Sequence, residues 1–188
     1  MSVSLLSYLS RTSRWLLLAA VLAAPAIACA SGKSVPGAAR SDRAKLLPAG
    51  GKPIEGTVET LDGKEVQLSS LRGHPVLLDF FATWCEPCRV GLPHTDALVQ
   101  SNAARGLQGW AISIDDERAP VAPFAEKLGL KLPVRWDRGG KSADALGVQV
   151  LPTLILLDAT GALRYRDSAE DPDLDAHVEQ ALDELLAH

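Results

Sequence analysis

The sequence predicts one α/β domain built around a central sheet. Apolar runs of strand length and stretches with helical spacing follow one another as hairpin, strand, helix, strand, helix, strand, second hairpin and final helix. Of the 188 residues, 47% are hydrophobic and 22% are charged, as expected of a globular domain with a core. This pattern occupies residues 54–188, and no internal repeat interrupts it.

The first half of the pattern predicts a hairpin, a buried strand and a helix. Residues 57–68 (TVETLDGKEVQL) form two alternating runs joined by an Asp-Gly pair, which favours a tight hairpin turn. Residues 75–82 (PVLLDFFA) are almost continuously apolar, as in a strand that is buried on both faces. Helical spacing follows over residues 86–104, and Pro93 should kink this helix.

The second half adds the remaining strands and helices. A second central strand is expected at 107–115, and a hairpin at 151–167 should turn near residues 159–161. The C-terminal helix is amphipathic, because its leucine and valine residues recur at helical spacing. The other expected elements are a helix at 119–130, a short strand at 132–137, a helical turn at 142–148 and the C-terminal helix at 172–188.

The N-terminus has the features of a secretory signal peptide. Arg11 and Arg14 precede an apolar run at 15–28 (WLLLAAVLAAPAIA), which is short and interrupted by proline for a membrane span. We therefore interpret residues 1–28 as a signal peptide, with an uncleaved anchor helix as the alternative. Residues 29–53 are rich in Gly, Ala, Ser and Pro without an apolar period, which predicts a flexible tether.

The end of the apolar run suggests how the exported protein is held. The sequence AIAC, ending at Cys29, resembles the lipobox of bacterial lipoproteins, although Ala26 stands where that motif usually has Leu. Cleavage before Cys29 would free its thiol for attachment of a lipid, whereas ordinary cleavage at AIA or ACA would leave a soluble product. In both cases we expect a periplasmic or otherwise extracytoplasmic protein, lipid-anchored at Cys29 in the first case.

The charge of the chain argues against a nucleic-acid partner. Its formal net charge is −4, and it has no basic patch of the kind that nucleic acid requires. Besides Cys29 it has two cysteines. A small exported domain stapled by disulfides would contain more of them at wider spacing.

Cys85 and Cys88 are separated by two residues in FFATWCEPCR. A tetrahedral zinc site needs four ligands, and the nearest imidazoles, His74 and His94, do not have ligand spacing. A purely structural disulfide that closes so short a loop would stabilise the fold little. Redox chemistry fits better, so we predict no metal at this pair.

The position of the pair favours an ionised sulfur. Cys85 is expected at or near the N-cap of the helix that Glu86 opens, where backbone N–H groups and the helix dipole stabilise a thiolate. Cys88 lies one turn further on the same face, within reach of a disulfide. Pro87 falls in the first turn, where its missing N–H does no harm. We predict that Cys85 is the exposed attacking sulfur and Cys88 the buried sulfur that resolves the mixed disulfide.

These residues also resemble a known family. The segment VLLDFFATWCEPCRVGLPH, together with a later VLPT, resembles the thioredoxin superfamily and in particular its exported TlpA/ResA-like branch. The resemblance covers residues 50–187 and implies a thioredoxin fold with an N-terminal β-hairpin and a central insertion ahead of the third core strand. A W-C-x-x-C motif in this context is far more specific than C-x-x-C alone.

The resemblance implies roles for three further residues. Asp79 matches the buried acid behind the active site, where many members of the exported branch have Asn. A buried carboxyl has a raised pKa and can pass protons to and from Cys88. Pro152 matches a cis-proline that faces the disulfide and contacts substrate chains. Trp84 is expected on the rim around Cys85, as a surface platform.

Glu86, between the cysteines, affects the expected direction of electron transfer. A thiolate beside a carboxylate, with no His or Lys between the cysteines, is less stabilised, and a less stable thiolate makes a more reducing pair. We therefore predict an exported thiol:disulfide oxidoreductase that reduces protein disulfides, for example in cytochrome c maturation. Its partners would be oxidised exported proteins and a membrane electron donor that recharges the WCEPC dithiol, and we expect no cofactor.

Two other functions stay open. The motif of thioredoxin-fold peroxidases places Pro and Thr ahead of the reactive cysteine, and this chain has Thr83 without a nearby proline. Copper-delivery proteins on the same fold usually have wider cysteine spacing and a distant His ligand. Here His177 and His188 fall in the predicted C-terminal helix. Peroxide consumption and copper titration distinguish these functions from thiol–disulfide exchange.

Overall fold

The computed structural model describes residues 46–169 and 173–187. The predicted signal peptide (1–28), Cys29 and the first part of the predicted tether lie outside these residues. Within the described part of the chain, no helix is both long enough and apolar enough to cross a membrane.

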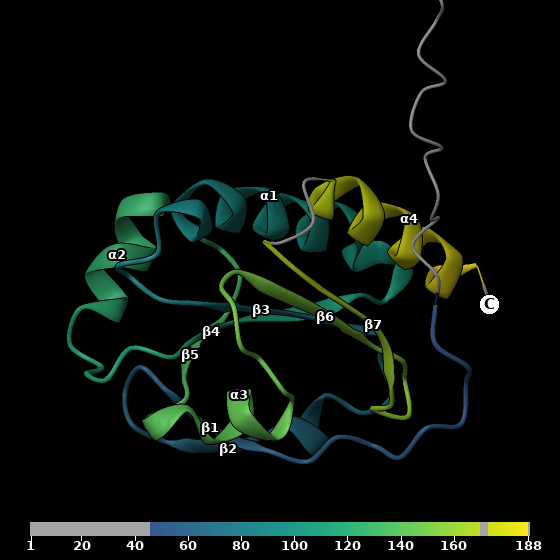
Figure 1. Cartoon of the computed structure of the whole chain (residues 1–188), viewed down its shortest axis with the longest axis horizontal. Coiled ribbons are helices and arrows are strands. Elements are labelled where there is room, and N and C mark those ends of the chain that lie inside the picture. Colours follow the sequence, from purple (N-terminus) through teal and green to yellow (C-terminus); the bar gives the residue numbers. More distant parts are fainter. Residues whose placement is uncertain (1–45, 170–172, 188) are drawn as a thin grey trace, which may run out of the picture. The chain divides into compact units, whose positions relative to one another are not determined.

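A seven-stranded mixed sheet forms the centre of the domain. Its strands are β1 (Thr57–Thr60), β2 (Glu65–Gln67), β3 (Val76–Phe81), β4 (Gln108–Ser113), β5 (Val134–Trp136), β6 (Thr153–Leu157) and β7 (Leu163–Ser168). They lie in the order β2-β1-β5-β4-β3-β6-β7 (Figure 1). β4 is parallel to both β3 and β5, whereas the other neighbours are antiparallel.

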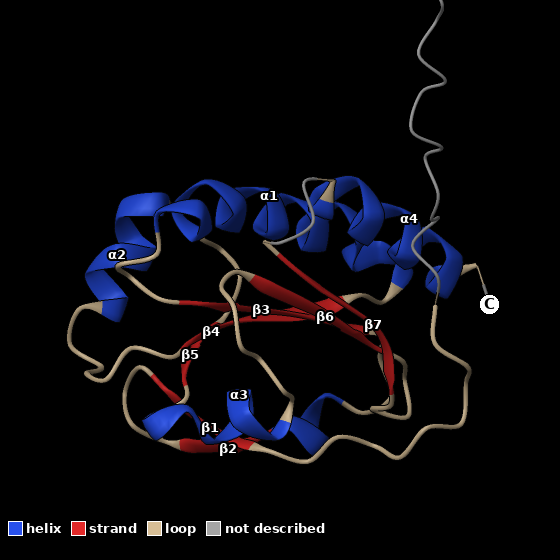
Figure 2. Ribbon diagram, viewed as in Figure 1, coloured by secondary structure: helices blue, strands red, loops and turns tan. Residues whose placement is uncertain are grey.

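Helices cover both faces of this sheet. They are α1 (Glu86–Asn102), α2 (Val121–Leu128), α3 (Lys141–Ala145) and α4 (Leu174–Leu186). Figure 2 shows α1, α2 and α4 on one face, and α3 near the β1–β2 hairpin on the other. The buried apolar residues divide in the same way: one cluster contains Leu92 of α1, Phe124 of α2 and Leu182 of α4, and the other contains Val58 of β1 and Ala143 of α3.

β3 is the central strand, and it leads directly into the predicted redox motif. All of its residues are buried, because helices cover the strand from both faces. Leu77 and Phe81 belong to the cluster beneath α1. Asp79 lies between them in the alternation and so faces the same side. α1 begins at Glu86, so residues 82–85 cross the carboxyl edge of the parallel strands.

The structure confirms the predicted α/β class and the predicted order of elements. The first hairpin turns at Gly63, with φ of 90°, and the second at Gly161, with φ of 86°. Such positive φ angles favour glycine because it has no Cβ. α1 continues through Pro93 as one helix. Between β4 and β6 the chain contains α2, β5 and α3, where the resemblance implied an insertion before the third core strand.

The predicted tether is too long at its C-terminal end. Leu47 N donates to Arg164 O at 2.6 Å, and Arg164 Nε donates back to Leu47 O at 2.8 Å. Pro53 forms a bridge with Ala162, just before β7. These contacts hold the segment 46–53 against the edge of the sheet, so the packed part of the chain begins before the predicted boundary at residue 54.

Candidate active site

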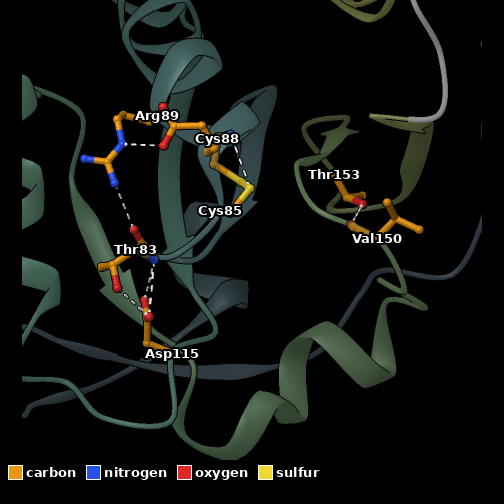
Figure 3. The surroundings of a disulfide bond; sticks show 8 residues. Thr83, Cys85, Cys88, Arg89, Asp115, Val150 and Thr153 are labelled. Carbon is orange, nitrogen blue, oxygen red and sulfur yellow. Dashed lines mark hydrogen bonds and ion pairs between the residues drawn. A yellow bond between two sulfur atoms is a disulfide. The ribbon is translucent and has the colours of Figure 1, made fainter.

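Cys85 and Cys88 form a disulfide at the point where β3 gives way to α1 (Figure 3). Cys85 is the N-cap of α1, and its Sγ accepts a hydrogen bond from Cys88 N at 3.2 Å. The two Cα atoms lie 5.3 Å apart. Pro87 falls in the first turn, where no intrahelical N–H bond is lost. The predicted placement of the pair at a helix N-terminus is therefore confirmed.

The prediction that Cys85 is exposed is wrong in degree. Cys88 is completely buried, but Cys85 is only 5% exposed. The loop at 148–151 and Ile114 come close to it and line a pocket of about 490 Å³, together with Trp84, Cys85, Glu86 and Pro87. Within the pair, Cys85 is the sulfur that opens to this pocket. A substrate sulfur must therefore reach it through the pocket rather than across an open surface.

Trp84 and the segment before Pro152 border the same pocket. Trp84 is 70% exposed, which is unusual for so large an apolar side chain. The Leu151–Pro152 peptide bond is cis, as the resemblance implied. Thr153 Oγ1 donates to Val150 O at 2.6 Å and holds the loop beside the disulfide (Figure 3). Contact of Trp84 and Pro152 with substrate stays a prediction.

Asp79 is a buried acid on the α1 face of the sheet. It is 1% exposed, and burial raises the pKa of Asp79 to about 7. A hydrogen bond with Thr95 of α1 opposes this rise, and the negative charge of Asp175 on α4 adds to it. Its Oδ1 atom has no hydrogen-bond partner among the described residues. The predicted burial of Asp79 is confirmed, and the direction of its pKa shift agrees with the prediction. The proton-relay role stays a prediction.

Glu86 has a charged partner that sequence reasoning missed. Arg89 Nε donates to Glu86 Oε2 at 3.1 Å, and another guanidinium nitrogen of Arg89 donates to Thr83 O at 3.4 Å. The guanidinium also lies 5.2 Å from the centre of the Phe124 ring. The prediction about direction considered only the residues between the cysteines. The i,i+3 spacing of Glu and Arg on a helix is the signal that could have indicated this pair.

Asp115 is a second buried acid near the disulfide, and the sequence interpretation did not select it. It follows β4 and is 4% exposed. Its carboxylate accepts hydrogen bonds from Thr83 N at 3.0 and 3.2 Å, from Thr83 Oγ1 at 2.7 Å and from Ser113 Oγ at 2.7 Å. Because β3 and β4 are parallel, their carboxyl ends meet at one edge of the sheet, which brings Asp115 to the segment before Cys85.

The histidines considered for zinc do not join the cysteines in a metal site. His94 lies on α1 and pairs with Glu179 of α4, with Nε2 and Oε1 at 3.2 Å. Across residues 46–169 and 173–187, no group of three or more His, Cys, Asp or Glu side chains is arranged to hold a metal ion.

Similarity to known proteins agrees with this geometry. The sequence profile of the AhpC/TSA family matches residues 50–166. The thiol-disulfide oxidoreductase ResA of Bacillus anthracis is 36% identical over 104 residues, which are 55% of this chain and 60% of ResA. The match therefore spans less than two thirds of the length of that relative.

Solved structures extend the comparison to the whole fold. A thiol:disulfide interchange protein DsbE from Chlorobium tepidum matches with a TM-score of 0.68 and 28% identity, over 74% of this chain and 99% of its own. The exposed lipoprotein thioredoxin of Streptococcus pneumoniae matches with a TM-score of 0.60 and 27% identity, over 70% of this chain and 100% of its own. These similarities confirm the thioredoxin-like fold.

Proposed function

This chain belongs to the thioredoxin-like AhpC/TSA family and is a homologue of the ResA thiol-disulfide oxidoreductases, and we propose that it is an exported enzyme that reduces protein disulfides through Cys85 and Cys88. The observation that carries the proposal is the Cys85–Cys88 disulfide at the N-terminus of α1, with Cys85 opening to a pocket. A reversible disulfide in this position stores two electrons, which it accepts or passes on by exchange.

The proposed reaction begins with the reduced pair. The Cys85 thiolate attacks one sulfur of a substrate disulfide, forms a mixed disulfide and releases the other substrate sulfur as a thiolate, which takes up a proton. Cys88 then loses its proton, and its thiolate attacks Cys85 Sγ. This step forms the Cys85–Cys88 disulfide and releases the second substrate thiolate. Two electrons have passed from the enzyme dithiol to the substrate, and a dithiol donor must return them.

Asp79 is our proposed acceptor for the Cys88 proton. Cys88 is a buried residue of α1, and Asp79 is buried on the sheet face that α1 covers. The raised pKa of Asp79, about 7, allows it to take up and release a proton near neutral pH. A carboxyl with an ordinary pKa would stay ionised at neutral pH and would hold the proton too weakly.

The proposed direction of transfer rests on the groups around Cys85 that could stabilise its thiolate. The helix N-terminus and Cys88 N favour the thiolate. The nearby positive charge of Arg89 is already balanced by Glu86. A strongly oxidising pair needs a strongly stabilised thiolate, so we assign this pair to the reducing side.

The site and the relatives support a proposed class of substrate and a proposed location. The exposed Trp84 and the mainly apolar pocket beside Cys85 suit an extended protein segment that carries a disulfide. Oxidised exported proteins, such as apocytochrome c during cytochrome c maturation, fit this description. We assign the chain to the outside of the cytoplasmic membrane, anchored by a lipid on Cys29 and recharged by a membrane electron donor. The pneumococcal relative is itself an exposed lipoprotein.

The reduction potential of the purified protein tests this function. The pair would be equilibrated with glutathione or dithiothreitol buffers, and the fractions of dithiol and disulfide would be quantified by mass after alkylation. We expect a value near that of thioredoxin, about −270 mV. A value near about −120 mV would instead identify an oxidant. Rapid consumption of hydrogen peroxide, or stoichiometric copper binding, would favour one of the two alternative functions.

A further inference from the structure

We propose that Asp115 is a positioning residue for the redox pair: by binding Thr83 it fixes the segment that places Cys85 Sγ against Cys88. This inference rests on the proposed function, because positioning matters only if the two sulfurs exchange partners. Asp115 does not touch the sulfurs or the substrate in this proposal. It acts through the backbone before Cys85.

Contacts on both sides fix Thr83 in place. All three polar groups of this residue are engaged: its N–H and its hydroxyl both bind the Asp115 carboxylate, and its carbonyl accepts a bond from Arg89. Figure 3 shows Thr83 held between Asp115 on one side and Arg89 on the other. Thr83 lies two positions before Cys85, so the start of this turn has little freedom to rotate.

Asp115 is itself held by other hydrogen bonds. Its side chain is buried and also accepts a bond from Ser113 Oγ at 2.7 Å. Its backbone carbonyl accepts a bond from the indole nitrogen of Trp136 at 2.7 Å. Ser113 of β4 thus fixes the carboxylate that binds Thr83, and Trp136 of β5 fixes the backbone of the same residue. Hydrogen bonds to a charged and buried acceptor are among the stronger ones in proteins.

The consequence concerns the closing of the disulfide. Cys88 is held inside α1, whereas Cys85 is at its N-cap and depends on the preceding segment for its position. The rate and equilibrium of ring closure depend on the effective concentration of one sulfur near the other, which falls when one of them is loosely held. A pair with a lower effective concentration closes less readily and is therefore less reducing.

The test measures the reduction potential of three variants of the full chain in glutathione buffers. Asp115→Asn removes acceptor capacity and charge, and Thr83→Val removes the hydroxyl donor while it leaves the Asp115 charge in place. Asp137→Asn is the matched control. Asp137 is a fully buried acid that accepts bonds from Ser142 N at 3.0 Å and Ala143 N at 2.7 Å, at the start of α3 on the opposite face of the sheet.

We expect Asp115→Asn to lower the effective concentration of one sulfur near the other about tenfold, which raises the reduction potential of the pair by about 30 mV. Thr83→Val should also raise the reduction potential. Asp137→Asn should lower the melting temperature without this shift. The proposal is overturned if Asp115→Asn and Thr83→Val reduce only the melting temperature. It is also overturned if Asp115→Asn alone shifts the potential, because the charge and not the positioning would then be responsible. If the wild-type pair itself did not exchange with glutathione, the proposed function would fail instead.

Discussion

Replacement of Cys85 by serine is expected to reduce the rate of protein-disulfide reduction to the uncatalysed level. Cys85 is the only one of the paired sulfurs that opens to the pocket, and a serine hydroxyl cannot form the mixed disulfide. The measurement is the turbidity that appears when dithiothreitol reduces insulin in the presence of the enzyme. Loss of the disulfide should not unfold the domain, because so short a loop contributes only about 2 kcal/mol to stability.

Cys29→Ser is the matched control for this experiment. It also replaces a cysteine by serine, but at a residue that takes no part in the proposed reaction, so insulin reduction should remain at the wild-type rate. The same variant tests the proposed anchor, since it should move from the membrane fraction to the soluble fraction of cells. Full activity in Cys85→Ser would show that the reaction does not pass through this sulfur.

Asp79→Asn is expected to stabilise the oxidised protein above pH 7 and to slow its turnover. The pKa of Asp79 rises from 3.8 to about 7 on folding. Between these values the folded state keeps a proton that the unfolded state has lost, so the contribution of Asp79 to stability falls as the pH rises through this window. Above about pH 7 the loss is complete and on the order of 4 kcal/mol. An amide, which carries no charge, avoids this loss.

Urea unfolding of the oxidised wild type and Asp79→Asn at pH 5 and pH 8 measures the effect. The variant should gain stability mainly at pH 8, and its stability should depend less on pH. Asp137→Asn makes the same chemical change at another buried acid. It weakens the bonds to Ser142 N and Ala143 N and should destabilise the protein at both pH values. Equal destabilisation of both variants would contradict the assigned pKa of Asp79.

The parts of the fold that the sequence predicts well are those with strong local signals. The Asp-Gly pair marks the first hairpin, and the apolar run at 75–82 marks the central strand. The burial of Asp79 could be predicted because a charged residue inside such an apolar run is hard to leave exposed. The cysteine spacing places both sulfurs at the start of a helix, where the structure has them. Each of these features depends on residues close together in the chain.

The features that sequence reasoning missed depend on distant contacts. Asp115 meets Thr83 only because β3 pairs with β4 in parallel, with Phe81 opposite Ser113. Asp175 approaches Asp79 only because α4 returns to pack on the same face of the sheet as α1. The low exposure of Cys85 likewise results from the loop at 148–151, which follows α3 and comes back to the disulfide. None of these contacts follows from local spacing.

The most direct test of the proposed function is to find which sulfur attacks the substrate. Cys88→Ser removes the resolving sulfur and should leave Cys85 joined to substrate as a stable mixed disulfide. Incubation of the reduced variant with an oxidised protein substrate, followed by peptide mass spectrometry, identifies the linked cysteine. We predict an adduct at Cys85 in Cys88→Ser and none in Cys85→Ser. An adduct that forms through Cys88 in Cys85→Ser, or no adduct in either variant, would contradict the proposed reaction.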